Sequence, residues 1–333
     1  MTNAIQTSPK IDRSSLIPPD QLRTLSRRSP SALASRLLFD YTLIVAAAAV
    51  CEVYWNPLVY MLAVMVIGAR QVGIGSIALH DGAHRMLARN KVVNDWVAQA
   101  IGFSVGMPIF EDFHGYRKQH FEHHQCTNTH DDPDGWNYEQ FYAMPRWKGA
   151  LLLLQALCGV IFLALFVRFL SNQWKTNKVR GLVAILCVFT VAIGYWGGVY
   201  AVQVGVLYGV IPLATWGAFV NLIRGLAEHY PENEFERGKD FPPLFRTREI
   251  LNSWFDQVFV ATRGVNFHLS HHLIPSVPFY NLPRLQQVLA QSETYQQYAH
   301  ITRGYHQFLM EYFFKRNKPC FDAGVSQPMA LNR

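Results

Sequence analysis

The sequence has few charged residues, and its cysteines are not arranged as in a disulfide framework or an iron–sulfur site. Only 16% of its 333 residues are charged, against about a quarter in average proteins, whereas 50% are hydrophobic. The five cysteines form no CxxC pair, and three lie in apolar runs, where they pack as small hydrophobic residues. The formal net charge is +7, but the Lys and Arg residues are scattered and no recognised nucleic-acid-binding motif accompanies them. These absences favour a membrane protein and argue against a nucleic-acid partner.

Long apolar runs are what the sequence has instead. A helix that spans a bilayer needs about 20 apolar residues. Two runs form a first predicted hairpin, and a third is long enough for a second hairpin that turns near Gly197–Gly198. Two further runs, one short and glycine-containing and one flanked by basic residues at both ends, are predicted to lie in or dip into the interface. The first hairpin is residues 37–55 and 57–79, and the second is residues 181–222. The two interfacial runs are residues 93–110 and 149–170.

The fold class predicted from these runs is an all-α integral membrane protein. We expect about four transmembrane helices in two hairpins, with interfacial helices and a cytoplasmic cap. Residues 1–36 are polar and are predicted to be a mobile cytoplasmic arm, residues 37–310 the membrane domain and residues 311–333 a C-terminal tail. Because basic residues favour the cytoplasmic side, the Arg-rich arm predicts a multi-pass protein with both termini in the cytoplasm. Arg70, inside an apolar run, is expected to snorkel or to mark the end of the span.

Histidines supply the strongest motif. Three strings, HDGAH, HFEHH and HLSHH, follow or precede the apolar runs. Residues three and four apart share one face of a helix, so each cluster directs its imidazoles the same way. Imidazole is a good ligand for iron, copper, zinc and nickel, and eight convergent copies suit two ions better than one. The clustered residues are His80, His84, His120, His123, His124, His268, His271 and His272.

With these motifs the chain resembles the integral-membrane fatty acid desaturase and hydroxylase superfamily. The three strings are similar to its three histidine boxes, in the same order, and RGLAEHY resembles the segment around an isolated histidine, here His229, that completes its ligand set. The resemblance covers about residues 75–290. It implies nine histidine ligands and a non-haem centre of two Fe ions at the cytoplasmic face, with O2 as co-substrate. It implies no catalytic residue beyond the metal ligands.

The HxxxH spacing of the first box is that of acyl-lipid desaturases and carotenoid hydroxylases. We therefore expect an enzyme that inserts a double bond into the acyl chain of a membrane lipid, because a metal centre supplies an oxidant that side chains alone cannot. No fused cytochrome b5 module is evident, so electrons are expected from a separate ferredoxin or cytochrome b5. A hydroxylase or ketolase acting on a carotenoid or alkyl chain is the alternative, and a non-catalytic metal-binding membrane protein is a third.

The residues around the boxes leave further alternatives open. Asp81, Glu122 and Glu228 adjoin predicted ligands and either orient imidazoles or are plain surface charges. The acidic residues at 131, 132 and 134 indicate a loop or cap, with support of the second box as the lesser alternative. Gly225 stands where acyl-CoA desaturases have an asparagine, and Asn221 and Asn266 are weak substitutes for it. Small residues beside the boxes are expected to set the width of a substrate tunnel, namely Gly73, Gly75, Gly102 and Ala227.

Overall fold

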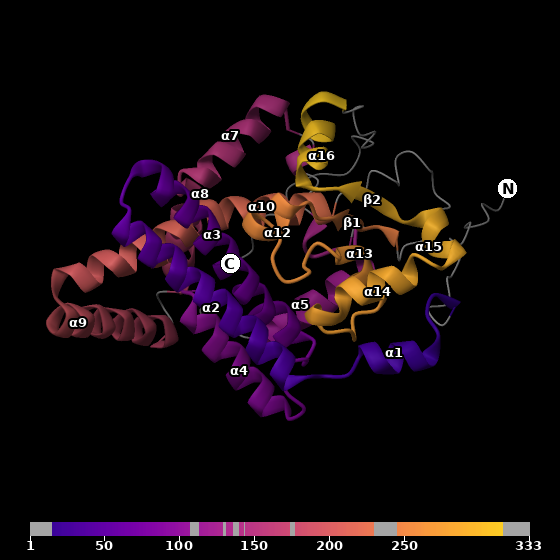
Figure 1. Ribbon diagram of the computed structural model, residues 1–333, viewed down its shortest axis with the longest axis horizontal. Coiled ribbons are helices and arrows are strands. Elements are labelled where there is room, and N and C mark those ends of the chain that lie inside the picture. Colours follow the sequence, from indigo (N-terminus) through magenta and orange to yellow (C-terminus); the bar gives the residue numbers. More distant parts are fainter. Residues whose placement is uncertain are drawn as a thin grey trace.

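The computed structural model describes residues 15–106, 113–128, 131–135, 140–142, 144–173, 177–229 and 245–315. These residues are mostly helical, which confirms the predicted fold class (Figure 1). The N-terminal elements are α1 (Pro19–Leu25), α2 (Pro30–Val53), α3 (Pro57–Ser76), the π-helical turn η2 (Ile77–Asp81), α4 (Lys91–Ser104) and α5 (Phe113–Cys126). The central elements are α7 (Arg146–Leu157), α8 (Val160–Gln173), α9 (Asn177–Gly205), the π-helical turns η3 (Val206–Val210) and η4 (Leu213–Gly217), and α10 (Ala218–Glu228). The C-terminal elements are β1 (Arg248–Leu251), α12 (Trp254–Phe259), α13 (His268–Leu273), η6 (Phe279–Asn281), α14 (Leu282–Leu289), α15 (Glu293–Tyr298), β2 (His300–Arg303), α16 (Tyr305–Met310) and η7 (Glu311–Lys315).

Helices α2 and α3 form the first predicted hairpin. Each begins with a proline at its first position, preceded by a side chain that caps the free amides: Ser29 for α2 and Asn56 for α3. Both are long and apolar enough to cross a membrane. Only 6% of the most apolar window of α2 is buried against 67% for the α3 segment. Helix α2 is therefore the outer, lipid-facing helix, and α3 carries the first histidine box inward.

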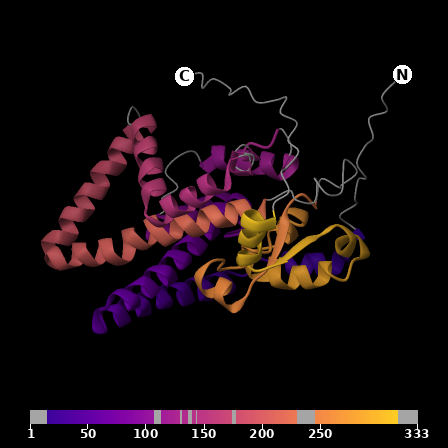
Figure 2. The same ribbon diagram turned by 90° about the horizontal axis from the view of Figure 1, so that it is seen from above.

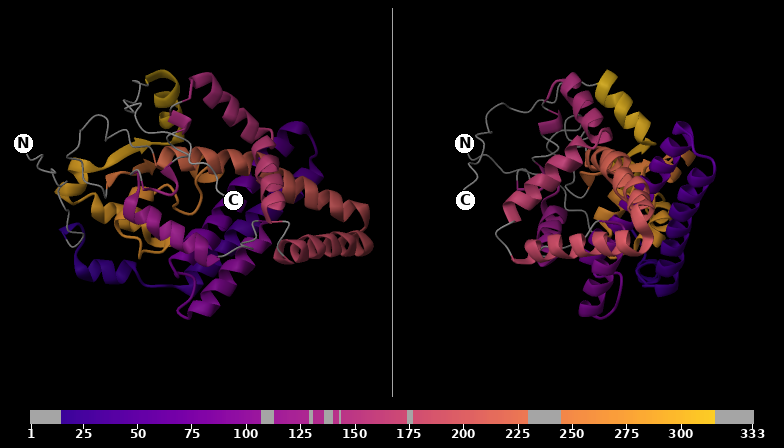
Figure 3. Two further views of the ribbon diagram at one scale, coloured as in Figure 1. Left: turned by 180° about the vertical axis from the view of Figure 1, so that it is seen from behind. Right: turned by 90° about the vertical axis from the view of Figure 1, so that its left-hand side faces the viewer.

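Helix α9 and the turns after it form the second apolar hairpin. The backbone turns at Gly198, whose φ of 67° is reached readily by glycine because it has no Cβ. Figures 2 and 3 show this turn at one end of the molecule, away from the C-terminal elements in orange and yellow. The apolar stretch Cys187–Glu228 is a further candidate span, which makes three among the residues that the structure describes, or four if the bent pair α7–α8 is counted. The turn lies where the sequence predicts it.

Helices α7 and α8 correspond to the basic-flanked run 149–170. They meet at an angle of 78°, and Gly159 at the break has a φ of 75°. Neither part alone is long enough to cross a bilayer. The bend agrees with a segment that dips into the interface and leaves again, and it also fits a broken span.

Arg70 is buried within α3, where it neither snorkels nor ends the helix. Its guanidinium donates to Oδ1 of Asp40 at 3.3 Å, and to the carbonyls of Gln257 and Val258 at 2.9 and 2.8 Å. Arg263 donates to the same Asp40 oxygen at 2.6 Å. A charge within an apolar run is thus explained by a buried ionic cluster that joins α2, α3 and α12.

The described part of the predicted N-terminal arm packs onto the molecule. Leu16, Ile17 and Leu25 are buried in the same hydrophobic cluster as Leu269 and Leu285 of the C-terminal part. Helix α2 already begins at Pro30, so residues 15–36 are ordered rather than a mobile arm, because their apolar side chains find a core to pack against. Residues 1–14 of that arm, and residues 316–333 of the predicted tail, lie outside the described residues.

The C-terminal elements form a cap over one end of the helices. Strands β1 and β2 pair in parallel, with Arg248 opposite His300 and Leu251 opposite Arg303. Helix α13, which carries the third histidine box, contacts β1 and α14. This cap brings the third box over the first and second boxes.

Candidate metal centre

The predicted ligands lie on, or directly after, four elements that converge on one place. The π-helical turn η2 carries His80, and His84 follows it one turn later. Single π-helical turns are rare and frequently occur at functional sites. Helix α5 carries the second box, α13 the third, and His229 immediately follows α10. All nine predicted histidines lie together, within two groups of five and four.

The two groups do not follow the histidine boxes, because α5 and α13 each contribute histidines to both groups. Within each group, one ring nitrogen of every member lies within 4.8 Å of the others. Helix α5 gives two histidines to one group and one to the other, and α13 gives one and two. The first group is His80, His84, His120, His124 and His271, and the second is His123, His229, His268 and His272.

The ring nitrogens are placed as if around a cation. His123 Nδ1 donates to Asp132 Oδ1 at 2.8 Å and His229 Nδ1 donates to the carbonyl of Gly225 at 2.9 Å. In the neutral rings, both Nε2 atoms then carry a lone pair, yet they lie 3.1 Å apart. Two nitrogens bound at about 2.1 Å to one metal ion, at a right angle, lie about 3 Å apart. The lone pairs that face each other are therefore suited to a metal ion.

The same spacing recurs in both groups. Nε2 of His84 and of His124 lie 2.9 and 3.2 Å from Nε2 of His120. In the second group, Nε2 of His268 lies 2.7 Å from that of His229 and 3.0 Å from that of His272. These donor sets can hold one metal ion each.

Burial keeps these imidazoles neutral. Burial, together with the neighbouring imidazole of His80, lowers the pKa of His84 to about 2, and burial lowers the pKa of His229 to about 3. The pKa values of His268, His271 and His272 are also well below the usual range, mainly through burial. Neutral imidazole is the form that binds metal, so the fold holds these rings ready as ligands.

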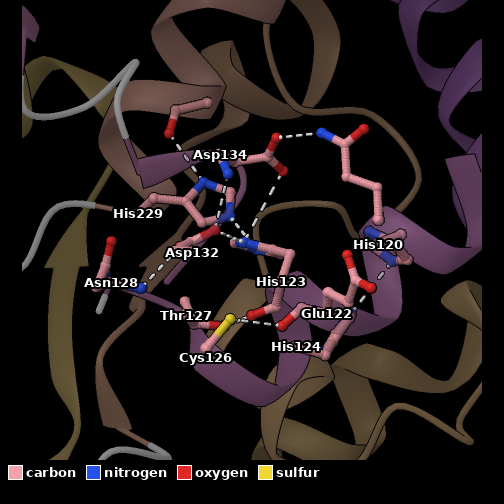
Figure 4. Close-up of polar contacts among 12 residues, drawn as sticks. His120, Glu122, His123, His124, Cys126, Thr127, Asn128, Asp132, Asp134 and His229 are labelled. Carbon is pink, nitrogen blue, oxygen red and sulfur yellow. Dashed lines mark hydrogen bonds and ion pairs between the residues drawn. The ribbon is translucent and has the colours of Figure 1, made fainter. Parts of the chain in front are cut away.

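Carboxylates behind the rings fix some of them (Figure 4). Asp132 accepts from His123 at 2.8 Å and also from the backbone amides of Asn128 and Asp134, at 2.7 and 2.9 Å. Burial alone would raise the pKa of Asp132, but the hydrogen bond from His123 and those from the two amides outweigh it and lower the pKa. Asp132 is thus an ionised, immobile acceptor. The structure agrees with the lesser of the two alternatives from the sequence, in which this acidic residue supports the second box.

Two of the three carboxylates next to predicted ligands also face rings. Asp81 Oδ1 lies 3.1 Å from His80 Nδ1, and its Oδ2 accepts from the amide of Phe279 at 3.2 Å. Glu228 Oε2 lies 3.7 Å from His268 Nδ1. Glu122 instead is exposed and lies 3.8 Å from Lys118 on the outer face of α5. Asp81 and Glu228 therefore face histidine rings whereas Glu122 faces solvent, and the difference comes from where each residue lies on its element and not from its distance in sequence to a histidine.

The third box is fixed from β1. Glu249 Oε2 accepts from the Ser270 amide at 3.0 Å, from the Ser270 hydroxyl, and from the Tyr295 hydroxyl at 2.8 Å. Burial raises the pKa of Glu249 to about 7 in spite of these donors. Because Ser270 lies between His268 and His271, this contact fixes the short helix α13. The sequence contains no motif that singles out Glu249.

The remaining histidines and asparagines lie elsewhere. His114 and His306 are exposed, His300 is half-buried, and none of the three belongs to either group; His130 lies outside the described residues. Asn266 is engaged with Ile250 on β1 through its side chain, at 2.7 Å. Asn221 lines the cavity described next.

A cavity of about 260 Å³ adjoins both groups. Its lining includes six of the nine histidines, Tyr116, which stacks on His120 at 5.6 Å, and the apolar side chains of Ile77, Leu79 and Phe279. Among the described residues that line it, none is Gly73, Gly75, Gly102 or Ala227, so the small residues expected to set a tunnel width do not line this cavity. A Cβ on Gly73 would lie 1.9 Å from Thr262 Oγ1, so that glycine serves the packing of α3.

The fold and the site together define a membrane protein with a histidine-rich metal centre. The family model for fatty acid desaturases matches residues 55–305 of the chain. The chain belongs to the fatty acid desaturase family, and it is an oxidoreductase of that type with a metal cofactor.

Curated relatives agree with this assignment. The chain is 28% identical over 280 residues to the dihydrorhizobitoxine desaturase of Bradyrhizobium elkanii, covering 78% of this chain and 76% of the relative. It is 28% identical over 313 residues to a Delta(12) acyl-lipid conjugase of Momordica charantia, covering 80% and 73%. The match to the sn-1 oleoyl-lipid 12-desaturase of Arthrospira platensis is 24% identical and spans 61% of this chain and 60% of that enzyme.

Proposed function

We propose that the protein is an O2-dependent di-iron desaturase that introduces a double bond into the acyl chain of a lipid. The observation that carries the proposal is the pair of imidazole groups, five and four, whose neutral Nε2 atoms face one another at metal-ligand spacing. The names of the relatives, which include acyl-lipid desaturases, support the acyl substrate. Two iron ions would supply the redox chemistry that removes hydrogen from an unactivated methylene.

The residues of this chain would hold the iron ions and orient the histidine rings. The first group would hold one iron and the second group the other, with Asp132 fixing the ring of His123 and Asp81 that of His80. The apolar side chains of the cavity would bind the chain next to both groups and exclude water. The reaction converts CH2–CH2 to CH=CH and, with two electrons and two protons from outside, reduces one O2 to two waters. We infer that a separate ferredoxin or cytochrome b5 delivers those electrons.

The test is the mass of the product. The protein is expressed in a host that has membrane lipids and no carotenoids, and its acyl chains are compared with those from cells expressing His271→Ala. We expect new unsaturated chains, lighter by two hydrogens, in the wild type only. Purified protein should make the same product with reduced ferredoxin or reduced cytochrome b5 as donor. Products that gain an oxygen, or products that appear only when carotenoids are supplied, would favour the hydroxylase or ketolase instead.

We also propose that the histidine groups and both termini face the cytoplasm. The arginines before α2, such as Arg27 and Arg28, and the bend in α7–α8 support this arrangement, since a segment that dips and returns keeps the second and third boxes on one side. Ser171, exposed near the end of α8, is the position that discriminates. In a cysteine-free background, Ser171→Cys should resist an impermeant thiol reagent added to intact cells and react after lysis. Ready labelling in intact cells would mean that α7–α8 crosses the bilayer.

A further inference from the structure

Helix α12 carries two exposed aromatic side chains that take no part in the metal centre. Trp254 is 74% exposed and Phe255 is 45% exposed, and both rings contact the half-buried ring of Phe259, with centroids 6.2 and 4.9 Å from it. The other exposed side chains of this segment, Ser253 and Gln257, are uncharged. Apolar side chains gathered at a surface mark a place where a protein contacts a partner or a membrane.

The carbonyl groups at the end of α12 are paired as they would need to be without water. The last four carbonyls of a helix have no partner within that helix. In α12 the first of the four accepts backbone amides of the following loop, and Arg70 of α3 donates to those of Gln257 and Val258 at 2.9 and 2.8 Å. Trp216 of η4 donates to the last, that of Phe259, at 2.6 Å. Within a bilayer every backbone polar group needs such a partner, so this helix end is suited to a place without water.

Helix α12 lies beside α3 and not beyond its end (Figure 1). Arg70 on α3, and Asp40 on α2, which accepts from Arg263 in the loop after α12 at 2.6 Å, each lie thirteen residues from the end of their helix at the joining turn. At about 1.5 Å per residue, this is about 20 Å from the turn. Tyr54 and Trp55 in that turn are exposed, as is typical of aromatic residues at a membrane interface. A hydrocarbon core about 30 Å thick that begins at the turn therefore extends about 10 Å past the level at which α12 is held.

We propose that α12 is inserted into the bilayer leaflet next to the metal centre, with Trp254 and Phe255 in contact with the lipid acyl chains. A protein that docks from the water phase would have to displace lipid to reach a face at this depth, so the depth favours lipid as the occupant. The proposal goes beyond the proposed function, because it requires α2 and α3 to cross the bilayer but holds whether or not the protein desaturates.

The insertion would have a consequence for the site. The loop 260–267 joins α12 to α13, which carries the third histidine box, and this loop contributes Val265 to the wall of the cavity. A membrane-inserted α12 therefore fixes the height of the third box relative to the leaflet and holds one wall of the cavity close to the lipid.

The test measures the surroundings of a nitroxide spin label on full-length protein in lipid nanodiscs that hold one chain each. The label is attached to Trp254→Cys or Phe255→Cys in a cysteine-free background. Collisions with O2, which concentrates in the bilayer, are compared with collisions with a polar, water-soluble nickel chelate. Val45→Cys, at a position on α2 that is 67% exposed, is the lipid reference, and Glu293→Cys, at an exposed charged position on α15, is the water reference.

We expect the labels at Trp254 and Phe255 to collide with O2 as often as the label at Val45 does. They should collide with the nickel chelate about tenfold less often than the label at Glu293, because polar solutes are excluded from the hydrocarbon core. A second measurement uses the native side chain and the conservative variant Trp254→Phe, which keeps an aromatic ring. The fluorescence that this variant loses relative to wild type should be quenched by lipids brominated on their acyl chains and not by aqueous iodide.

Two results would overturn the proposal. Labels at Trp254 and Phe255 that meet the nickel chelate as often as the label at Glu293 would place α12 in water. Labels that neither O2 nor the chelate reaches would mean that a protein surface, and not lipid, covers the face. If the label at Val45 also behaves as in water, the proposal fails together with the hairpin of α2 and α3, whereas a failure of the desaturase proposal would appear only in the product analysis.

Discussion

Replacing His268 or His271 by alanine is expected to reduce turnover by more than about a hundredfold, because removal of an outer partner of a ligand alone costs about 10–100-fold. The two histidines lie three residues apart on α13 but belong to different groups, His271 to the group of five and His268 to the group of four. Each variant therefore removes one imidazole from one proposed iron site. The helix itself should persist, since Glu249 still binds Ser270 in both variants. The measurement is product formed per folded protein.

His114→Ala is the matched control. His114 lies on α5 with the second box, but it is exposed and belongs to neither group. Its ring contacts Arg117 at 3.3 Å, and Arg117 keeps its bonds to Ala83 and Asp95 without it. Activity within about twofold of wild type is expected, since isolated surface substitutions are usually small in effect. Substantial activity in His268→Ala or His271→Ala would remove that residue from the proposed ligand set.

The second large effect is expected for Asp132→Ala. This change leaves Nδ1 of His123 without its acceptor, and the loop amides of Asn128 and Asp134 lose theirs. We expect metal affinity and turnover to fall about 10–100-fold, the range for partners that orient metal-bound histidines. Metal retained after dialysis against a graded series of chelator concentrations measures the affinity.

Glu122→Ala is the control for Asp132→Ala. Glu122 is next to His123 in sequence, but its carboxylate is exposed and faces Lys118. An exposed pair of this kind contributes little, so metal retention should match wild type. Equal losses in the two variants would mean that acidic charge near α5, and not the bond to His123, is what matters.

How far the sequence predicts the site is clear from the second box. The spacing of His120, His123 and His124 places all three toward one side of a helix, and the structure has them there. That His123 joins His229 while its two neighbours join His80 depends on where α10 and α13 lie. Such tertiary placement is not contained in the spacing of one helix. The role of Asp132 is hidden for the same reason, since a loop returns it to the helix nine residues on.

The fold, like the site, has some features that the sequence predicts and others that depend on tertiary contacts. Apolar runs and capping residues predict the hairpin of α2 and α3 and the turn at Gly198, because length and glycine content are local properties. The short parallel pair of β1 and β2 joins segments about fifty residues apart, and four-residue strands carry too little pattern to be recognised. Arg70 is misread from sequence because its partner Asp40 lies on another helix and two of its acceptors are backbone carbonyls.

The most direct test of the central claim is the metal content of the purified protein. Elemental analysis of protein produced with iron and kept folded should give two iron ions per chain for wild type. His268→Ala and His271→Ala should each hold close to one, since each leaves the other imidazole group intact. One metal ion per chain in the wild type, or bound haem, would contradict the account.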